Sequence, residues 1–355
     1  MGRKLQSCLF TSTFMLFVIA DAAHAARVHV GVFTLFHPRV LTLAPGPGHA
    51  MVVRAGKDFL VLEEGQFAQC RVAGTELECR AGERLLSATT IRAAGRGHTD
   101  EDFTLSVPGK IVRDYHGRLE ILVHEAELVP IVNMSLELAV ASAVAAESPP
   151  LATLQALEAQ AIVTRSYYVA AHHRHALFDF CDTTHCQFLR GVPGTESPAR
   201  RVAAATRGMV LLYRGTIVPA LFSASCGGRT RTLREIGMHT NGYPYFSVRC
   251  EACLHSAKKW TARISLHDAA PILAHPGWEQ ARLQVDRKLG WDEIPGDNYS
   301  VKIEGKTAVL TGRGAGHGVG LCQLGAATLA REAWSYSRIL AYYFPGTTIG
   351  SRRGH

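Results

Sequence analysis

Short apolar runs separated by turn residues dominate the first third of the chain. Between residue 27 and about residue 129 the runs VHVGVFTLF, MVVRAG, FLVLEE, FTLSVP and LEILVH follow one another. Gly, Pro and Asp lie between them, a spacing that is typical of short β-strands joined by turns. We therefore expect residues 26–130 to form a β-rich N-terminal region.

The hydrophobic pattern becomes helical after Asn133. Residues 135–146 are rich in Leu, Ala and Val, which suits a helix, and the segment ESPP at residues 147–150 interrupts it. Glu147 is thereby expected in a short loop between two helices. From the residues alone, a solvated acid at a helix boundary is at least as good an interpretation of Glu147 as a functional group.

A second helix is expected from Leu151 to about Ala171. Ser148 is predicted to cap it, with Pro149 at the first helical position, where a missing N–H costs nothing. One face is predicted to carry the apolar side chains of Leu154, Leu157, Ala161 and Tyr168. A first region of strands followed by helices indicates an α+β protein. We expect a β-rich N-terminal lobe and a mixed helical and β lobe over residues 131–355, arranged around a cleft.

The first 25 residues have the layout of a secretory signal peptide. Arg3 and Lys4 precede an apolar run at residues 8–20, and Ala23-His24-Ala25 forms a small-x-small cleavage pattern. The run is shorter than the roughly 20 residues that a membrane-spanning helix needs. We expect cleavage after residue 25, no stable transmembrane anchor, and a secreted, periplasmic or cell-wall-associated product.

The chain of 355 residues is basic, with a formal net charge of +8, and 47% of its residues are hydrophobic. That hydrophobic content indicates a globular protein, and the charge suits an anionic partner such as an envelope polymer. Nucleic acid is not expected as a partner, because the chain is predicted to be exported and has no run of Lys and Arg with interleaved aromatic residues.

Eight cysteines follow residue 25, and outside the cytosol each must be paired, metal-bound or buried. Cys70 and Cys79 flank a plausible hairpin turn, which predicts a disulfide between two short strands. His175, Cys181, His185 and Cys186 supply two imidazoles and two thiols within a short segment, the ligand set of a tetrahedral zinc site. The alternative for this second group is a Cys181–Cys186 disulfide beside two surface histidines.

Two further motifs are rich in glycine. In the string SASCGGRT, Cys226 could be a nucleophile at a tight turn, but we favour a turn that lets a chain or ligand approach, with Cys226 tied to Cys250 or Cys253. The four residues Cys226, Cys250, Cys253 and Cys322 also allow a second metal site. The string GRGAGHGVGLCQLGA at residues 312–326 is a weak dinucleotide signal, and a loop that presents His317 and Gln323 to a polar ligand is the more natural interpretation.

Six strings, in order, resemble the stage II sporulation protein D and amidase-enhancer (SpoIID/LytB) family of cell-wall proteins. The first runs from YHG through NMSLE, the next four are VAAESP, LEAQAIVTRSY, CDTTHCQ and SCGGRT, and the sixth runs from the glycine-rich string through YFPGT. Together they extend over about residues 113–349, whereas residues 26–105 resemble the family only loosely.

The resemblance implies a peptidoglycan lytic transglycosylase, a lyase that cleaves glycan strands between MurNAc and GlcNAc and leaves 1,6-anhydro-muramyl ends. Glu147 matches the family's catalytic glutamate, although Ser148 stands where many relatives have Met. The resemblance also implies a structural zinc ion on His175, Cys181, His185 and Cys186. The polar candidates for orienting the sugars are Arg165, Tyr167, Gln187, Ser225, His317 and Gln323.

Three functions compete on these grounds. In the first, one carboxyl group, Glu147, acts as both acid and base, whereas ordinary glycosidases use two carboxylates. In the second, the protein binds peptidoglycan glycan strands without cleaving them and stimulates a cell-wall amidase. The expected partners are then the glycan strands and the amidase. The third, a zinc hydrolase, is disfavoured because four protein ligands leave the metal no position for water.

Overall fold

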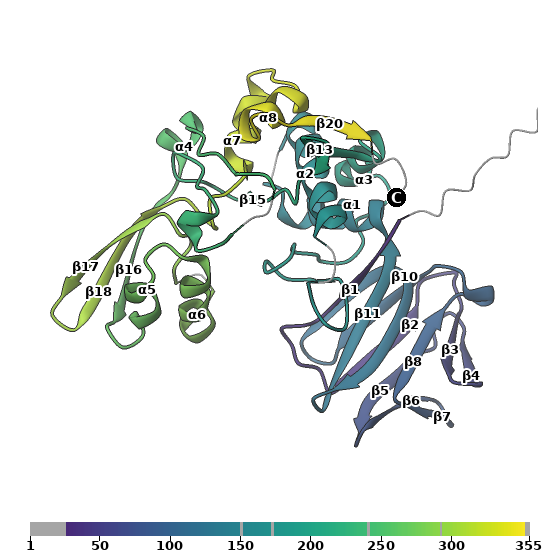
Figure 1. The fold of residues 1–355 in the computed structure, drawn as a ribbon. Coiled ribbons are helices and arrows are strands. Elements are labelled where there is room, and N and C mark those ends of the chain that lie inside the picture. The colour runs from purple at the N-terminus through teal and green to yellow at the C-terminus, as the bar shows by residue number, and fades with distance from the viewer. Residues whose placement is uncertain (1–25, 150–151, 172–173, 240–241, 292, 352–355) are drawn as a thin grey trace, which may run out of the picture.

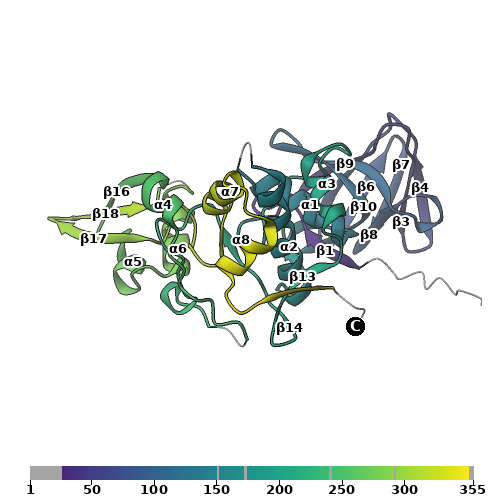
Figure 2. The same cartoon turned by 90° about the horizontal axis from the view of Figure 1, so that it is seen from above.

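The computed structural model describes residues 26–149, 152–171, 174–239, 242–291 and 293–351. Three parts follow one another along the molecule in both views: a large sheet, a group of helices and a small unit of strands and helices (Figure 1, Figure 2). Three buried apolar clusters underlie this arrangement. The predicted signal peptide, residues 1–25, lies outside the described residues.

The first part is a twelve-stranded sheet whose main path runs β12-β1-β11-β10-β9-β2-β5-β6-β7, with β8 pairing β10 and β3, and β4 pairing β3. A short 3₁₀ helix, Arg96–His98, lies between β8 and β9. The strands are β1 (Arg27–Gly31), β2 (Val40–Pro45), β3 (Met51–Ala55), β4 (Asp58–Leu62), β5 (Ala68–Ala73), β6 (Glu76–Ala81), β7 (Arg84–Ala88), β8 (Thr90–Ala94), β9 (Glu101–Val107), β10 (Ile111–His124), β11 (Glu127–Ser135) and β12 (Phe180–Cys181).

The strand-rich character expected for this part of the chain is confirmed. Along β2 and β9 buried side chains alternate with partly exposed ones, because successive residues of a strand point to opposite faces. Cys70 and Cys79 lie directly opposite each other on β5 and β6 and form the predicted disulfide. Strand β11 carries the sheet to Ser135, beyond the predicted boundary at residue 130.

The second part contains most of the helices. They are α1 (Leu136–Glu147), α2 (Leu154–Ala170), α3 (Pro198–Ala205), α4 (Glu251–Ser256), α7 (Gln323–Arg331) and α8 (Tyr336–Tyr343), with a 3₁₀ helix at Arg234–Ile236. Two small sheets accompany them, one of β14 (Thr216–Ile217), β13 (Met209–Tyr213) and β20 (Thr348–Ser351), the other of β15 (Phe222–Ser223) and β19 (Leu321–Cys322).

The predicted start of the second helix is wrong. Ser148 ends α1 instead of capping α2, which begins at Leu154 after Thr153. The backbone of Ser148 is extended, as expected of a residue that precedes a proline, because the proline ring disfavours the helical conformation there. Glu147 is consequently the last residue of α1 and not part of a loop.

The single apolar face predicted for α2 is also incomplete. Leu157 and Ala161 pack in one apolar cluster with the large sheet, while Ile162 and Val163 pack in the other with α7 and α8. Leu154, expected on the buried face, is exposed. Helix α2 is therefore a central helix buried on two sides, for which a one-sided pattern is not required.

The third part is the small unit of β16 (Lys259–Ser265), α5 (Ala270–Ala274), α6 (Glu279–Leu289), β17 (Tyr299–Glu304) and β18 (Thr307–Arg313). Its strands pair in the order β16-β18-β17. Residues 131–355, predicted to form one domain, contribute to three apolar clusters, and two of these lie entirely within that range.

The predicted α+β class is confirmed, because helices and several sheets coexist in the molecule. Among the described residues, no helix combines the length and the apolar composition that spanning a lipid bilayer requires.

Candidate functional site

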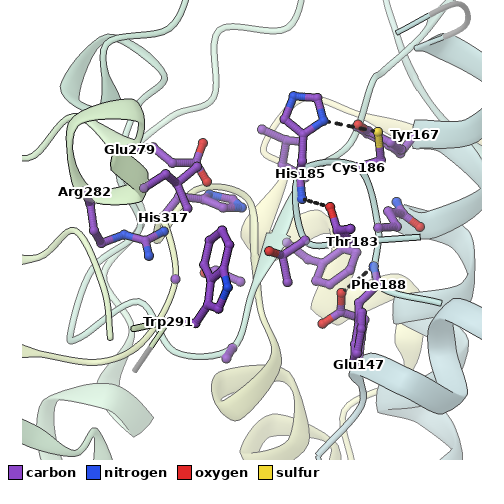
Figure 3. Close-up of a pocket in the computed structure, with 18 of the residues that line it drawn as sticks. Glu147, Tyr167, Thr183, His185, Cys186, Phe188, Glu279, Arg282, Trp291 and His317 are labelled. Atoms are coloured by element: carbon purple, nitrogen blue, oxygen red, sulfur yellow. Dashed lines mark hydrogen bonds between the residues drawn. The ribbon is translucent and has the colours of Figure 1, made fainter. Parts of the chain in front are cut away.

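A cavity of about 550 Å³ lies between the helices of the second part and α6 of the third (Figure 3). The described residues that line it are residues 183–188 and 220–224, Gly316 and His317, the residues Glu279, Arg282, Leu283, Arg287 and Trp291 of α6 and the loop after it, and Leu35, Glu147, Tyr167 and Pro295.

Glu147 reaches this cavity from the C-terminal end of α1, and its carboxyl group is held from one side. Oε1 accepts a hydrogen bond from the backbone N–H of Phe188 at 2.8 Å. The side chain of Gln323 donates to the backbone carbonyl of Glu147 at 2.9 Å. Among the residues that the structure describes, no group donates to Oε2, so this oxygen is open to a ligand.

Glu147 also borders a second cavity, of about 820 Å³, which Ser225, Trp260 and Gln323 help to line. The two cavities share three lining residues, Glu147, Ala224 and Pro295. A polymer that passes from one cavity to the other would therefore present one of its internal bonds to Glu147.

Burial raises the pKa of Glu147 above its ordinary value of 4.5, because desolvation disfavours the charged carboxylate. The N–H of Phe188 and the positive charge of Arg190 act in the opposite direction, but they are the smaller effects. A carboxyl group with a raised pKa keeps its proton closer to neutral pH, which a general acid requires.

The loop that carries Phe188 is fixed to the large sheet through Asp182. This buried carboxylate accepts hydrogen bonds from the N–H of Phe33 at 2.8 Å and from the guanidinium group of Arg113 at 2.7 Å. Strand β12, just before it, pairs in parallel with β1. The backbone N–H that meets Glu147 is therefore positioned by contacts far away in the sequence.

The same loop brings together the four predicted metal ligands. His175, Cys181, His185 and Cys186 place one ligand atom each within 4.8 Å of the others. Nε2 of His175 lies 3.3 Å from Sγ of Cys186, and Cys181 and Cys186 are free thiols, which contradicts the alternative of a disulfide between them. Two thiols and two imidazoles at such distances fit one tetrahedral metal ion.

A second group of thiols lies in the core of the helical part. Cys226, Cys250, Cys253 and Cys322 are buried and free, and their sulfur atoms also lie within 4.8 Å of one another. The structure thus shows no disulfide between Cys226 and either Cys250 or Cys253. Because Cys226 is 1% exposed, it has no access to a substrate as a nucleophile.

Three of the predicted sugar-orienting residues line the first cavity: Tyr167, Gln187 and His317. Gln187 is the most informative, since its side chain is 2% exposed and neither its amide oxygen nor its amide nitrogen has a hydrogen-bond partner among the described residues. The hydroxyl group of Tyr167 accepts a hydrogen bond from Arg174 at 2.7 Å. Nδ1 of His317 accepts from the N–H of Val319, which leaves Nε2 as the protonated nitrogen of the neutral ring.

The other three predicted residues lie elsewhere. Ser225 and Gln323 line the second cavity, and the Ser225 hydroxyl group lies 3.2 Å from Sγ of Cys253. Arg165 is 0% exposed and lines neither cavity, because its guanidinium group is bound to Glu137 at 2.6 Å inside the protein. Arg165 therefore connects helices and does not reach a ligand in the cleft.

The far wall of the cleft consists of residues that the sequence did not predict to be functional. Figure 3 shows Glu279, Arg282 and Trp291 on the side opposite Glu147 and Phe188. These residues belong to no recognisable motif, and an aromatic residue near a charged helix was the only available signal. Ser223, a buried hydroxyl without a hydrogen-bond partner among the described residues, also faces the first cavity and was not singled out.

Comparisons with known proteins agree with the motifs. A family model described as "Stage II sporulation protein" matches residues 124–213. Stage II sporulation protein D of Bacillus subtilis is 26% identical, with 61% of this chain and 75% of that protein covered. An uncharacterized protein of Brachyspira hyodysenteriae is 25% identical, with 66% and 72% covered.

The amidase enhancer of Bacillus subtilis is 22% identical over 58% of this chain, which spans only 39% of that longer protein. The matched segment of the family model contains Glu147, the loop around Asp182 and the four predicted metal ligands. The chain is therefore similar to members of the stage II sporulation protein D and amidase enhancer family, and this similarity supports a cell-wall-related function.

Proposed function

We propose that the protein is a peptidoglycan lytic transglycosylase that cleaves the bond between MurNAc and GlcNAc and leaves 1,6-anhydro-muramyl ends. The observation that carries the proposal is Glu147, a residue with a raised pKa that lines both cavities. The resemblance of the chain to the family supplies the substrate class. The two cavities next to Glu147 supply room for sugars on both sides of the bond that is cleaved.

The reaction needs one proton carrier that works in both directions. Protonated Glu147 donates its proton to the glycosidic oxygen while the bond from that oxygen to C1 of the muramyl sugar breaks. The resulting carboxylate takes the proton of the C6 hydroxyl group of the same muramyl sugar, while the C6 oxygen forms a bond to C1. The N–H of Phe188 stabilises the carboxylate in the interval, and the product contains no added water.

Gln187, His317 and Tyr167 are proposed to orient the sugar in the first cavity. The unpartnered amide of Gln187 has donors and an acceptor for hydroxyl or acetamido groups, and Nε2–H of His317 is a further donor. Ser225 belongs to the second cavity, where it would meet the other side of the scissile bond. Gln323 acts through the backbone of Glu147 and is proposed as a positioning residue.

His175, Cys181, His185 and Cys186 are proposed to hold a structural zinc ion. Zinc bound there would cross-link the loop, and the four protein ligands leave no position for water. This loop also carries Gln187 and the N–H of Phe188. The metal would thus keep two cleft groups in place without taking part in the reaction.

The decisive experiment is digestion of purified glycan strands, with and without stem peptides, followed by mass spectrometry. Wild type should release anhydro-muramyl ends, and Glu147→Gln should lower the rate at least about 100-fold. Glu332→Gln, which changes an exposed acid outside both cavities, is the matched control and should retain wild-type activity. Absence of anhydro ends with wild type, or their release by Glu147→Gln, would refute the proposal.

The relative named amidase enhancer supports a second candidate function. A protein that binds glycan and recruits or stimulates a cell-wall amidase would use the same cleft without chemistry at Glu147. It should bind glycan strands equally well with Glu147→Gln and should raise the rate of stem-peptide release by an added amidase. If the purified chain does not sediment with peptidoglycan, this second candidate function fails.

We further propose that the chain is exported and that cleavage after Ala25 yields a secreted, periplasmic or cell-wall-associated protein. The relation to sporulation and cell-wall proteins supports this location. The mass of the protein recovered from the envelope fraction tests it, and an intact N-terminus in that fraction would contradict cleavage.

A further inference from the structure

Four cysteines from three distant segments meet in the core of the helical part. Cys226 follows β15, Cys250 and Cys253 lie at the start of α4, and Cys322 ends β19. All four are at most 1% exposed, and their sulfur atoms lie within 4.8 Å of one another. Because these segments are separated by up to 96 residues, only the fold brings the thiols together.

The distances fit one metal ion better than disulfides. Four thiolates that bind one zinc ion at about 2.3 Å would lie roughly 3.8 Å apart. The sulfur atoms of Cys253 and Cys322 are 3.3 Å apart, which exceeds the roughly 2.05 Å of a disulfide. Cys70 and Cys79 in the same molecule are bonded, whereas these four are free.

Polar groups of the protein surround the sulfur atoms, as they do around metal-bound thiolates. The backbone N–H groups of Cys226 and Gly325 both donate to Sγ of Cys322 at 3.4 Å. The hydroxyl groups of Ser225 and Tyr343 lie 3.2 and 3.3 Å from the sulfur atoms of Cys253 and Cys250. Such outer contacts orient the ligands of a metal and stabilise their charged form.

The surroundings leave little room for anything else. Gly325 has no space for a side chain, because a Cβ there would contact the sulfur of Cys250 and the hydroxyl group of Tyr343. The remaining neighbours belong to an apolar cluster that includes Val319, Leu321 and Phe344. A cation bound by four thiolates would offset the cost of burying their charge there.

We propose that Cys226, Cys250, Cys253 and Cys322 bind one zinc ion, separate from the His175–Cys186 cluster, and that this ion braces one wall of the cleft. Cys226 comes shortly after the cavity residues Ser223 and Ala224. Cys322 immediately precedes Gln323, whose amide holds the backbone of Glu147. The ion would connect these two segments to α4.

The test is the metal content of the full chain after purification without chelators. The variant with both Cys181→Ser and Cys186→Ser removes the first cluster, so any zinc that remains reports on the four thiols alone. We expect about one zinc ion per chain in this variant, and X-ray absorption at the zinc edge should show about four sulfur neighbours at 2.3 Å. This outcome does not depend on whether the first cluster binds zinc or whether the protein cleaves glycan.

Two further double variants test which cysteines bind the metal. Cys253→Ser combined with Cys322→Ser should lose about one zinc ion per chain relative to wild type, whereas Cys70→Ser combined with Cys79→Ser, which removes the disulfide, should lose none. Alkylation of unreduced wild type in denaturant and chelator does not depend on whether the variants fold. It should label all four cysteines, because none of them is in a disulfide. The proposal is overturned by less than about half a zinc ion in the first variant, by iron in place of zinc, or by disulfide-linked peptides containing these cysteines.

Discussion

Glu147 is positioned twice, through its carboxyl group by Phe188 and through its backbone by Gln323. Neither contact could be read from sequence, because the partners lie far from Glu147 along the chain. The resemblance implied a catalytic role for Glu147, and the fold adds a physical property that suits the proposed acid. That property is burial, which raises the pKa of Glu147.

The raised pKa predicts how stability should depend on pH. A buried carboxyl group whose pKa is higher in the folded state favours folding below the unfolded pKa, and this contribution is lost as pH rises through the folded pKa. Glu147→Gln should therefore have a higher Tm than wild type at about pH 8, with the difference shrinking toward about pH 4. Thermal unfolding of both proteins across this range is the measurement, and a difference that is constant with pH would contradict it.

Activity should follow the same titration in the same direction. If protonated Glu147 is the acid, the rate should fall as pH rises through its folded pKa, because the donor form disappears. Rates of anhydro-muramyl release, measured over pH at saturating and at low glycan concentration, test this. A rate that rises with pH over the interval would exclude Glu147 as the donor.

Gln187 offers a test that separates binding from folding. Its amide is buried without partners, so Gln187→Met should leave the free protein equally stable or more stable. Glycan binding should weaken about fivefold to tenfold, since the ligand loses one or two hydrogen bonds. Glycan sedimentation and thermal unfolding measure the two effects, and Gln280→Met, at an exposed site on α6 outside the cavities, is the matched control. Unchanged glycan binding would remove Gln187 from the site.

At the scale of elements, α2 is the helix around which the second part is built. The composition of this segment predicts a helix. It predicts neither the residue at which the helix starts nor the two faces that are buried. The reason is that a helix enclosed by the sheet on one side and by α7 and α8 on the other does not need an amphipathic pattern. Arg165 illustrates the same difficulty, because a polar residue in a family motif can serve the core.

Arg165 connects α2 with its neighbours inside the protein. It pairs with Glu137 of α1 and donates to the carbonyl groups of Ala203 and Met209, each at 3.1 Å. Arg165→Met leaves Glu137 without its cation, and we expect the free energy of unfolding to fall by about 3 kcal/mol. Denaturant unfolding measures it, with Arg201→Met, at an exposed position of α3, as the control. Wild-type stability together with lost glycan binding would instead restore Arg165 to the sugar site.

At the scale of the whole molecule, the cleft exists because two parts with separate apolar clusters face each other. The family motifs supply Glu147 and the predicted metal ligands His185 and Cys186 on one side, and the small unit supplies Glu279, Arg282 and Trp291 on the other. Arg282 is held there by ion pairs with Asp286 and Asp297, each at 2.8 Å. The far wall is thus built on a fixed charged network.

Trp291 is the exposed aromatic residue of that far wall, 48% exposed and facing the first cavity. If glycan lies in the cleft, Trp291→Ala should weaken binding about tenfold, because a large apolar face is lost from the contact. Phe67→Ala, at an exposed aromatic residue that lines neither cavity, should leave binding unchanged. Equal binding by Trp291→Ala and wild type in the sedimentation assay would place the ligand elsewhere.

The sequence by itself determined the strand-rich first part, the presence of the two helices around Glu147, the Cys70–Cys79 pair and the ligand group at residues 175–186. These features depend on local spacing: alternation along strands, residue propensities in helices, and ligands close together in the chain. The family resemblance added the interpretation of Glu147, which spacing alone left open.

Only the tertiary structure decided which groups meet across the chain. The contacts of Glu147 with Phe188 and Gln323, the burial of Arg165, the far wall with Trp291 and the gathering of Cys226 with Cys250, Cys253 and Cys322 join segments separated by many residues. Such contacts leave no periodic trace in one sequence, because they depend on how helices and sheets pack and not on the residues beside them.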